Sequence, residues 1–148
     1  MVYKRFDDKL VIRLKKGDKL VESVREILEK ENVKAGFLTG IGATDNLEVG
    51  LFDPESKDYK IKKYEEDLEI ANLCGNISNK DGKLYTHFHI TCGRAKSNVN
   101  EGSLAGEAIA GHLNEAVISL TAEIFVTIID GEINRIYDQD LGLNLIEF

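Results

Sequence analysis

Only one stretch of this 148-residue chain carries the apolar periodicity of a helix, and it lies near the N-terminus. Asp18 stands where an N-cap residue belongs, and the pattern ends near Asn32. Five apolar residues fall on one stripe, while the charged residues between them face the other way. They are Leu20, Val21, Val24, Ile27 and Leu28. The rest of the core must therefore come mostly from strands.

The remaining apolar runs are of strand length and are separated by turn signals. Asn79-Lys-Asp-Gly82 is a strong hairpin turn, and the run 35–39 stops at Gly40-Ile-Gly42. The polar, glycine-studded stretch 93–111 is predicted to be a loop with a short helix at 104–110. The tail 141–148 is apolar enough to dock on the body. Strands are predicted at 9–15, 35–39, 47–52, 59–64, 68–78, 83–92, 117–129 and 132–137.

One strong helix and many hairpin-like strands predict an α+β fold with a mainly antiparallel sheet. The apolar fraction of 43% is enough for a core without disulfides, and no linker divides the chain. Residues 1–148 are therefore expected to form a single domain. The two cysteines, Cys74 and Cys92, are not in a Cys-x-x-Cys pair and are expected to be reduced and packed in the core.

The charge and the apolar runs bear on location and partners. A net charge of −7 disfavours general attraction to nucleic-acid phosphate. Lys60, Lys62 and Lys63 form a small basic cluster, but three acidic residues follow at 65–67, which favours a solvated strand face. No apolar run is long enough to span a bilayer, and the first residues do not resemble a signal peptide. We expect a cytoplasmic protein.

His87 and His89 form a His-x-His pair on the predicted strand 83–92. Residues i and i+2 of a strand share a face, roughly 6–7 Å apart, so both rings can reach one ion at ~2.0–2.1 Å. The other face carries Phe88 and Ile90, which form a packing side. A His-x-His pair can also be an ordinary solvated feature of a sheet.

His112 follows the glycine-rich stretch, and Gly111 before it would let a backbone approach closely. Three neutral imidazoles would form a facial ligand set with an open position, as in catalytic zinc sites. Alternatively, His112 can be a residue at the end of a helix. With a tight hairpin, Cys74 would lie opposite His87 and could add a fourth ligand, although a small residue under the sheet is the simpler interpretation.

Several segments, in this order, resemble the PPC domain shared by stand-alone prokaryotic proteins and plant AT-hook nuclear proteins. They are Gly36-Phe-Leu-Thr-Gly-Ile-Gly42, Leu68-Glu-Ile-Ala-Asn-Leu-Cys-Gly-Asn-Ile-Ser78, Asp81-Gly82, His87-Phe-His-Ile90, Gly111-His-Leu113 and Thr121-Ala-Glu-Ile-Phe125. The resemblance covers nearly the whole chain. It implies a PPC-like fold, a homotrimer, and a divalent metal, usually zinc, on the histidines that match His87, His89 and His112.

Two departures from the family pattern affect function. The chain has no Arg-Gly-Arg-Pro hook, with Gly93-Arg94 as its nearest trace, and the stretch between His89 and His112 looks longer than usual. The leading hypothesis is a trimeric, zinc-binding module with a regulatory role that takes a small ligand or a partner protein. The alternatives are a DNA-binding regulator, which the charge disfavours, and a metal-dependent hydrolase. A hydrolase would need a general base, for which Glu123 and Glu69 are the candidates.

Overall fold

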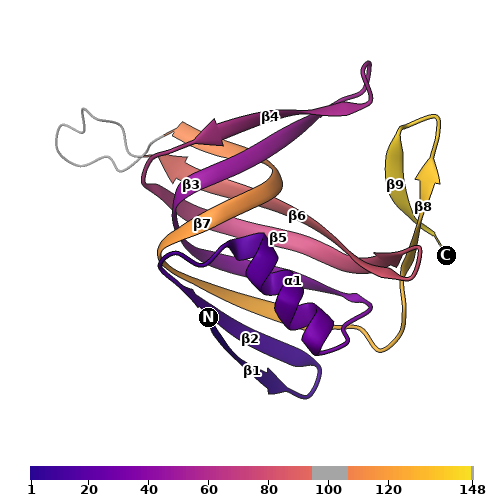
Figure 1. Cartoon of the computed structure of the whole chain (residues 1–148), viewed down its shortest axis with the longest axis horizontal. Coiled ribbons are helices and arrows are strands. Elements are labelled where there is room, and N and C mark those ends of the chain that lie inside the picture. Colours follow the sequence, from indigo (N-terminus) through magenta and orange to yellow (C-terminus); the bar gives the residue numbers. More distant parts are fainter. Residues whose placement is uncertain (95–106, 148) are drawn as a thin grey trace.

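The computed structural model describes residues 1–94 and 107–147, which form a mainly antiparallel sheet with one helix (Figure 1). The path of paired strands is β1-β2-β7-β3-β5-β8-β9, with β4 paired to β3, and β6 paired to both β5 and β7. The helix is α1 (Leu20–Lys30). The strands are β1 (Val2–Phe6), β2 (Lys9–Lys15), β3 (Gly36–Asp53), β4 (Asp58–Tyr64), β5 (Leu68–Lys80), β6 (Lys83–Arg94), β7 (Glu107–Ile128), β8 (Asn134–Asp138) and β9 (Leu143–Glu147).

Four of these strands form a closed circuit, in which each strand pairs with two of the others. β3 pairs with β5, β5 with β6, β6 with β7, and β7 again with β3. The circuit closes because β3 and β7 are long and change partners along their length, and register shifts interrupt their shared ladder. Such irregularities bend a strand and increase its local twist. The two bent strands therefore bring β6 and the first half of β7 together, which matters for the site.

The prediction that a strand ends at Gly40-Ile-Gly42 is wrong, because β3 runs through these residues with a bulge between Gly40 and Gly42. The glycines serve a close approach of strands instead of a turn. A Cβ on Gly42 would lie 2.5 Å from the carbonyl oxygen of Thr121 in β7. Glycine therefore lets the two backbones meet where a side chain would push them apart.

The prediction of a short helix at 104–110 is also wrong for the described part, since β7 begins at Glu107. Residues 104–106 lie outside the described residues. Glu107 pairs with Arg94, and Ile109 pairs with Cys92, so this segment extends the sheet beside β6. Ladder pairing with a distant strand overrides the local apolar spacing, which is a weak predictor by itself.

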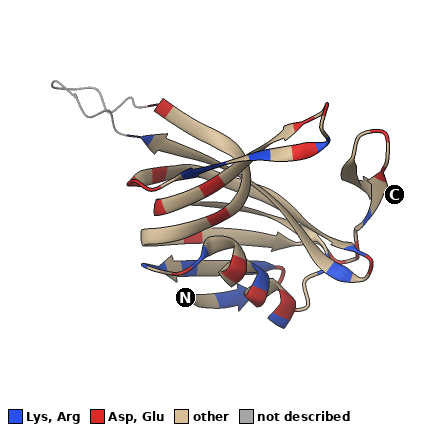
Figure 2. Cartoon of the chain, turned by 45° about the horizontal axis from the view of Figure 1, so that its top comes forward, with Lys and Arg blue, Asp and Glu red and all other residues tan. Residues whose placement is uncertain are grey.

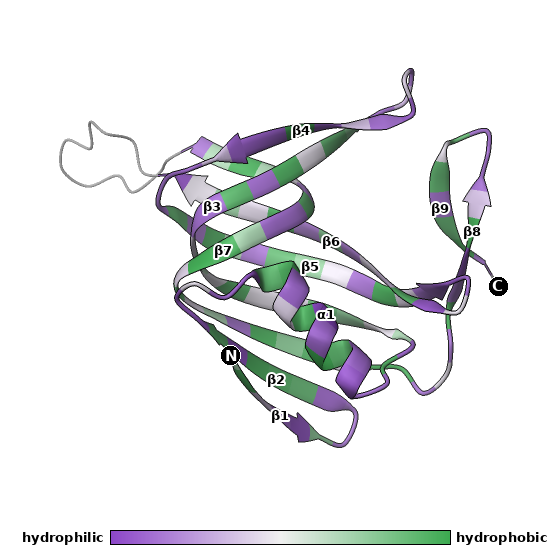
Figure 3. Cartoon of the chain, viewed as in Figure 1, coloured by the Kyte–Doolittle hydropathy of each residue, from purple (hydrophilic) through white to green (hydrophobic). Residues whose placement is uncertain are grey.

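The core lies between α1 and the inward faces of the strands. The predicted helical stripe is confirmed, with Leu20, Val24, Ile27 and Leu28 buried and Val21 partly buried. Figure 3 shows the helix with alternating apolar and polar segments where it lies across the sheet. Truncation of a buried leucine such as Leu28 to alanine typically costs about 2–5 kcal/mol. Within the described residues, no helix combines the length and the apolarity needed to cross a membrane.

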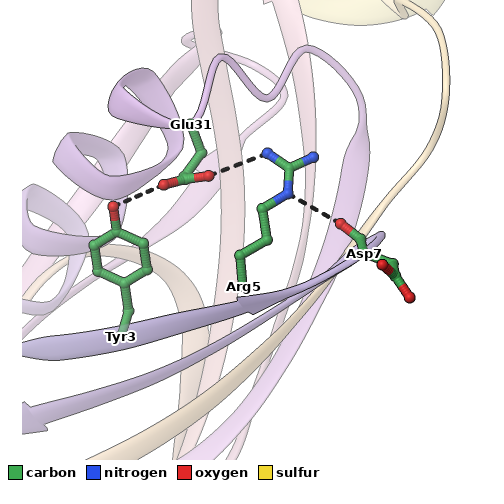
Figure 4. Close-up of polar contacts among 4 residues, drawn as sticks. All are labelled: Tyr3, Arg5, Asp7 and Glu31. Carbon is green, nitrogen blue, oxygen red and sulfur yellow. Dashed lines mark hydrogen bonds and ion pairs between the residues drawn. The ribbon is translucent and has the colours of Figure 1, made fainter.

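Both ends of α1 are held by strands. The predicted cap at Asp18 is wrong: the N-cap residue is Lys19, without a side-chain cap, and the backbone N–H groups of Val21 and Glu22 donate to the Glu115 carboxylate at 2.7 and 3.2 Å. At the other end, Glu31 accepts hydrogen bonds from Tyr3 (2.7 Å) and Arg5 (3.1 Å) of β1 (Figure 4). At the N-terminal end of α1, the negative charge of Glu115 also complements the positive end of the helix dipole.

The C-terminal tail forms a hairpin in which β9 pairs with β8. This hairpin stands at one end of the molecule, apart from the helix (Figure 1). Its ladder contact with the rest of the sheet is a single parallel pair, Asn79 with Asn134. The side chain of Arg135, from the base of β8, adds a second connection to β5 through Ser78 and Asn76.

Candidate metal centre

The strand β6 carries two of the three histidines on one face, as the sequence alternation predicts. Phe88 and Ile90 are buried in the core, whereas His87 is half-buried and His89 is exposed. The hairpin that positions them turns through Asp81 and Gly82, which both have positive φ, as a two-residue turn between right-twisted strands requires. The rings of His87 and His89 have centroids 5.1 Å apart, and their Nε2 atoms are 3.2 Å apart.

The third histidine comes from β7, where His112 pairs directly with His89 across the β6–β7 ladder. Its ring centroid lies 4.9 Å from that of His87 and 5.7 Å from that of His89. One ligand nitrogen from each of the three rings lies within 4.8 Å of the other two. The structure therefore brings together all three histidines that the sequence singles out.

Close approach of β3 and β7 sets the position of His112. Gly50 of β3 pairs with His112, and a Cβ on the neighbouring Gly111 would lie 2.8 Å from the Gly50 carbonyl oxygen. The absence of a side chain at Gly50 leaves room for Tyr59 of β4, whose ring centroid is 4.9 Å from that of His112. The predicted role of Gly111, a close backbone approach at the site, agrees with this geometry.

The histidines line a cavity of about 530 Å³ between the closed strand circuit and the C-terminal hairpin. Its described lining is aromatic and apolar, with few polar groups and no carboxylate. The residues are Gly50, Leu51, Phe52, Tyr59, Tyr85, His87, His89, Ala110, Gly111, His112, Arg135, Leu143, Asn144 and Leu145. A concave, mostly apolar wall with a few convergent polar groups is the usual form of a small-molecule site.

Burial keeps two of the rings neutral. The pKa of His87 is lowered to about 4, first by desolvation and then by the charges of His112, His89 and Arg135. The pKa of His112 is also lowered, first by desolvation and then by His89. A neutral imidazole is the form that binds a metal.

The donor set suits a divalent metal ion. Nδ1 of His112 is buried without a hydrogen-bond partner, which is costly for a polar atom unless something else binds there. Three imidazole nitrogens suit zinc and similar ions, and they leave at least one coordination position open. The three residues could hold such an ion on geometry and chemistry together.

Residues 1–130 match the model of the Plants and Prokaryotes Conserved domain, abbreviated PCC or PPC. The chain belongs to this family. No curated protein gives a significant match. The expectation drawn from the sequence segments is thus confirmed for the family and for the fold.

Three solved structures show how similar this PPC chain is to others. A "putative DNA-binding protein" from Bacteroides thetaiotaomicron is 33% identical, with a TM-score of 0.90, over 99% of this chain and 96% of that one. A metal-containing protein from Archaeoglobus fulgidus is 33% identical, with a TM-score of 0.84, over 100% and 99%. A PPC protein from Pyrococcus horikoshii is 30% identical, with a TM-score of 0.79, over 99% and 94%.

Cys74 is not part of the converging set in this PPC protein. The expected pairing with His87 is wrong by two residues, because Cys74 pairs with His89 and Asn76 pairs with His87. The two-residue turn draws Asn79 and Lys80 into the ladder, which shifts the register. Cys74 is exposed, against the expectation of a core residue, whereas Cys92 is buried and its pKa is raised to about 11 by burial.

The two candidate general bases do not line the histidine cavity. Glu123 lies on an exposed position of β7 opposite Arg13, and Glu69 lies at the start of β5 opposite Gly93. The lysine cluster is largely neutralised, because Lys60 pairs with Asp53 at 2.5 Å and Lys63 pairs with Glu48 at 2.8 Å. The third lysine, Lys62, lies over the ring of Tyr64.

Sequence reasoning missed four lining residues that carry a polar group, which are Tyr59, Tyr85, Arg135 and Asn144. Tyr85 could have been found, since it precedes His87 by two residues on the same strand face. Arg135 and Asn144 come from the C-terminal hairpin, which no local pattern connects to the histidines. Their presence at the cavity depends on long-range contacts, which are the pairing of Asn79 with Asn134 and the hydrogen bonds of Arg135 to β5.

Proposed function

We propose that residues 1–148 form a single PPC domain that binds one divalent, zinc-like ion per chain through His87, His89 and His112. The observation that carries the proposal is the convergence of three ligand nitrogens within 4.8 Å at the wall of a cavity. The relative from Archaeoglobus fulgidus, described as metal-containing, adds independent support. The bound ion would serve as a Lewis acid that anchors a small ligand, or a group of a partner protein, at its open position.

Binding of a ligand suits this site better than hydrolysis does. A metal-dependent hydrolase would need a general base within hydrogen-bond reach of the bound water, directly or through one further water. The described lining of the cavity holds no carboxylate, and Glu69 and Glu123 lie elsewhere. The chain's own residues therefore provide a binding pocket with an aromatic wall, formed by Tyr59 and Tyr85, around the three imidazoles.

Metal analysis of the purified protein tests this proposal. We expect close to one ion per chain in the wild type, and loss of most of it in His87→Ala and in His112→Ala, because each substitution removes one of three ligands. Cys74→Ala is the matched control, since Cys74 lies beside His89 in the ladder but outside the converging set. Full occupancy in a protein without the three histidines would place the ion elsewhere and refute the proposal.

We also propose that the chain assembles as a homotrimer. Large apolar side chains stand exposed on one face of the sheet, including Phe37 (52% exposed), Ile41 (60%) and Phe125 (55%). Phe37 and Ile41 lie two residues before and after Thr39 in β3, so the three side chains point to the same face. Phe125 of β7 pairs directly with Thr39 and therefore shares that face. An apolar face of this kind is typical of a protein–protein contact, and the family resemblance favours a closed ring of three copies.

A DNA-binding role is the second candidate, because the relative from Bacteroides thetaiotaomicron is described as a "putative DNA-binding protein". The charges of this chain weigh against it. Figure 2 shows basic and acidic residues interspersed along the strands, and the net charge is −7. Affinity for duplex DNA depends on a concentration of lysine and arginine that can displace counterions. We therefore rank DNA binding below the metal module.

A further inference from the structure

Arg135 is a buried arginine with an unbalanced charge. Its side chain is part of a residue that is 7% exposed, and it extends from the base of the C-terminal hairpin. Nε donates to Ser78 Oγ at 2.8 Å, Nη1 to the carbonyl oxygen of Asn144 at 2.6 Å, and Nη2 to Asn76 Oδ1 at 2.5 Å. All three acceptors are neutral. The guanidinium also lies 4.9 Å over the ring of Tyr85.

Because its three acceptors are neutral, the guanidinium of Arg135 has a charge that they do not balance, and it has donors that they do not use. A guanidinium has five N–H donors, and three direct bonds account for three of them. Burial of a cation is expensive unless an anion accompanies it, which is why buried arginines usually pair with carboxylates. Among the described residues, no carboxylate lies within ion-pair distance of Arg135, and none lines the cavity that it borders.

The position of Arg135 connects it to the histidine site. Its partner Asn76 pairs directly with His87 across the β5–β6 ladder, so the guanidinium lies beside that histidine on the same face. Arg135 and the three histidines line one cavity. The charge of Arg135 is also one of the causes that lower the pKa of His87, after desolvation and the other two histidines. With a cation in its described lining and no carboxylate, this cavity has a positive character.

A second polar atom in the cavity lacks a partner. Oδ1 of Asn144 is buried and accepts no hydrogen bond, while the Nδ2 of the same amide donates to the Tyr85 hydroxyl at 3.3 Å. If the amide were turned over, its nitrogen would instead be the unpaired atom. In either orientation, one polar atom of this amide has no hydrogen-bond partner among the described residues.

We propose that the cavity binds a small organic oxyanion, with Arg135 as the residue that receives its carboxylate or phosphate group. A hydroxyl or N–H next to that group donates to Oδ1 of Asn144, and an apolar part packs against Leu143 and Leu145. The planar guanidinium matches both carboxylate and phosphate. This inference rests on the proposed function only in that the metal site opens into the same cavity, and the anchor at Arg135 needs no metal.

A purely structural role would account for part of the evidence. The three hydrogen bonds of Arg135 attach the C-terminal hairpin to β5, and a clamp of this kind would need no ligand. Such a clamp needs hydrogen-bond donors, however, and does not by itself require a net charge. The residues with the unpaired charge and the unpaired amide atom, Arg135 and Asn144, both line one cavity. Anion binding accounts for these two features and for the unused donors together.

Isothermal titration calorimetry with three probes tests the proposal: inorganic phosphate, acetate and lactate, with chloride at matched ionic strength as the reference. Each is titrated into metal-loaded and metal-free protein. We expect at least one oxyanion to bind the wild type, with lactate above acetate because its hydroxyl can reach Asn144. Arg135→Gln should weaken this binding about tenfold or more, because a charged hydrogen bond is lost. A stronger response to phosphate identifies the phosphate class, and a stronger response to lactate identifies the hydroxycarboxylate class.

Asn76→Asp keeps the test decisive if Arg135→Gln does not fold. Asp is nearly isosteric with Asn, retains the acceptor for Nη2, and supplies an internal anion for Arg135. It should leave the protein folded and abolish oxyanion binding, because the guanidinium is then already paired. Arg25→Gln, on the exposed side of α1, removes the same charge far from the cavity and should bind like the wild type.

The outcomes separate this inference from the metal proposal. If the wild type holds no metal at the histidines, Arg135-dependent anion binding to the metal-free protein still supports the anchor. Two results would overturn the inference: no oxyanion binds either form of the wild type, or Arg135→Gln and Asn76→Asp bind oxyanions as the wild type does. Metal content, measured on the same preparations, should stay near the wild-type value in both variants.

Discussion

His87 should make the stability of the metal-free protein depend on pH. Burial, aided by His112, His89 and Arg135, lowers its folded-state pKa to about 4, whereas a histidine in an unfolded chain titrates near ~6.5. The unfolded state therefore takes up the proton first as the pH falls. The contribution of neutral His87 to stability is complete above about pH 6.5 and is lost as the pH falls toward about 4.

Thermal unfolding of the metal-free protein from about pH 7.5 to about pH 4.5 measures this effect. We expect the melting temperature to fall with decreasing pH, and to fall less steeply in His87→Gln, which has no ionisable group at that position. Carboxylates contribute to both proteins, so the difference between the two slopes isolates the histidine. Equal slopes in the two proteins would show that His87 is not held neutral by burial.

The bent strands β3 and β7 decide where His112 lies, and Gly111 is the point at which they can be tested. A Cβ on Gly111 would lie 2.8 Å from the backbone oxygen of Gly50, an atom that cannot rotate away. Gly111→Ala should therefore push β7 from β3, lower stability by about 1–3 kcal/mol, and weaken metal binding through His112. Urea denaturation and metal titration measure the two effects.

Gly93→Ala is the matched control for this element. Gly93 also lies in the β6–β7 ladder, and a Cβ there meets no atom within 4 Å. Alanine at this position should leave both stability and metal binding close to those of the wild type. If both alanine variants behaved alike, close packing at Gly111 would not be what positions His112.

The elements also show what the sequence could predict and why the rest escaped it. The stripe of α1 and the presence of a hairpin at Asn79–Gly82 depend on residues close in sequence, and both are predicted correctly, although the turn itself is confined to Asp81-Gly82. His87 and His89 were placed on one face because strand alternation is local. The predicted strand breaks at Gly40-Ile-Gly42 and before Val117 are wrong, because β3 and β7 continue through these positions. Glycine occurs both in turns and where two strands approach closely, and the local sequence does not distinguish the two.

The cavity was the least predictable part of the site. His112 joins His89 through pairing between strands that are separated by residues 95–106, and Arg135 reaches Asn76 across 59 residues of sequence. No periodicity records such contacts. The three histidines could be grouped because metal chemistry favours the combination, whereas a single arginine or asparagine has too many ordinary roles for the sequence to single it out.

At the scale of the whole molecule, the exposed apolar face predicts the assembly. Phe125→Asp places a charge in the middle of this face, opposite Val11 of β2 and Thr39 of β3, and should shift the trimer toward monomers. Size-exclusion chromatography with light scattering measures the mass. Leu141→Asp, in the turn of the C-terminal hairpin, changes an equally exposed apolar residue and should leave the trimer intact. A wild-type protein that stays monomeric at micromolar concentration would contradict the proposed trimer.

The charge of the assembled molecule predicts weak or absent binding to duplex DNA near physiological salt. Each chain carries a net charge of −7, and a trimer triples it, which deepens the long-range repulsion of phosphate. The lysine cluster offers little compensation, because Lys60 and Lys63 are paired with Asp53 and Glu48. A basic groove formed between subunits is the arrangement that could reverse this expectation.

Titration of a fluorescently labelled duplex against the protein at several salt concentrations tests the prediction. A variant with Glu65, Glu66 and Asp67 all changed to lysine is the positive control, since it turns residues 62–67 into a basic run that only Tyr64 interrupts. It should bind more tightly than the wild type, with a steeper salt dependence, because each added lysine can release counterions from the phosphates. Sub-micromolar binding by the wild type, with a steep salt slope, would mean that the subunits combine their basic residues into a groove. DNA binding would then replace the metal-centred pocket as the first candidate for the function of this PPC protein.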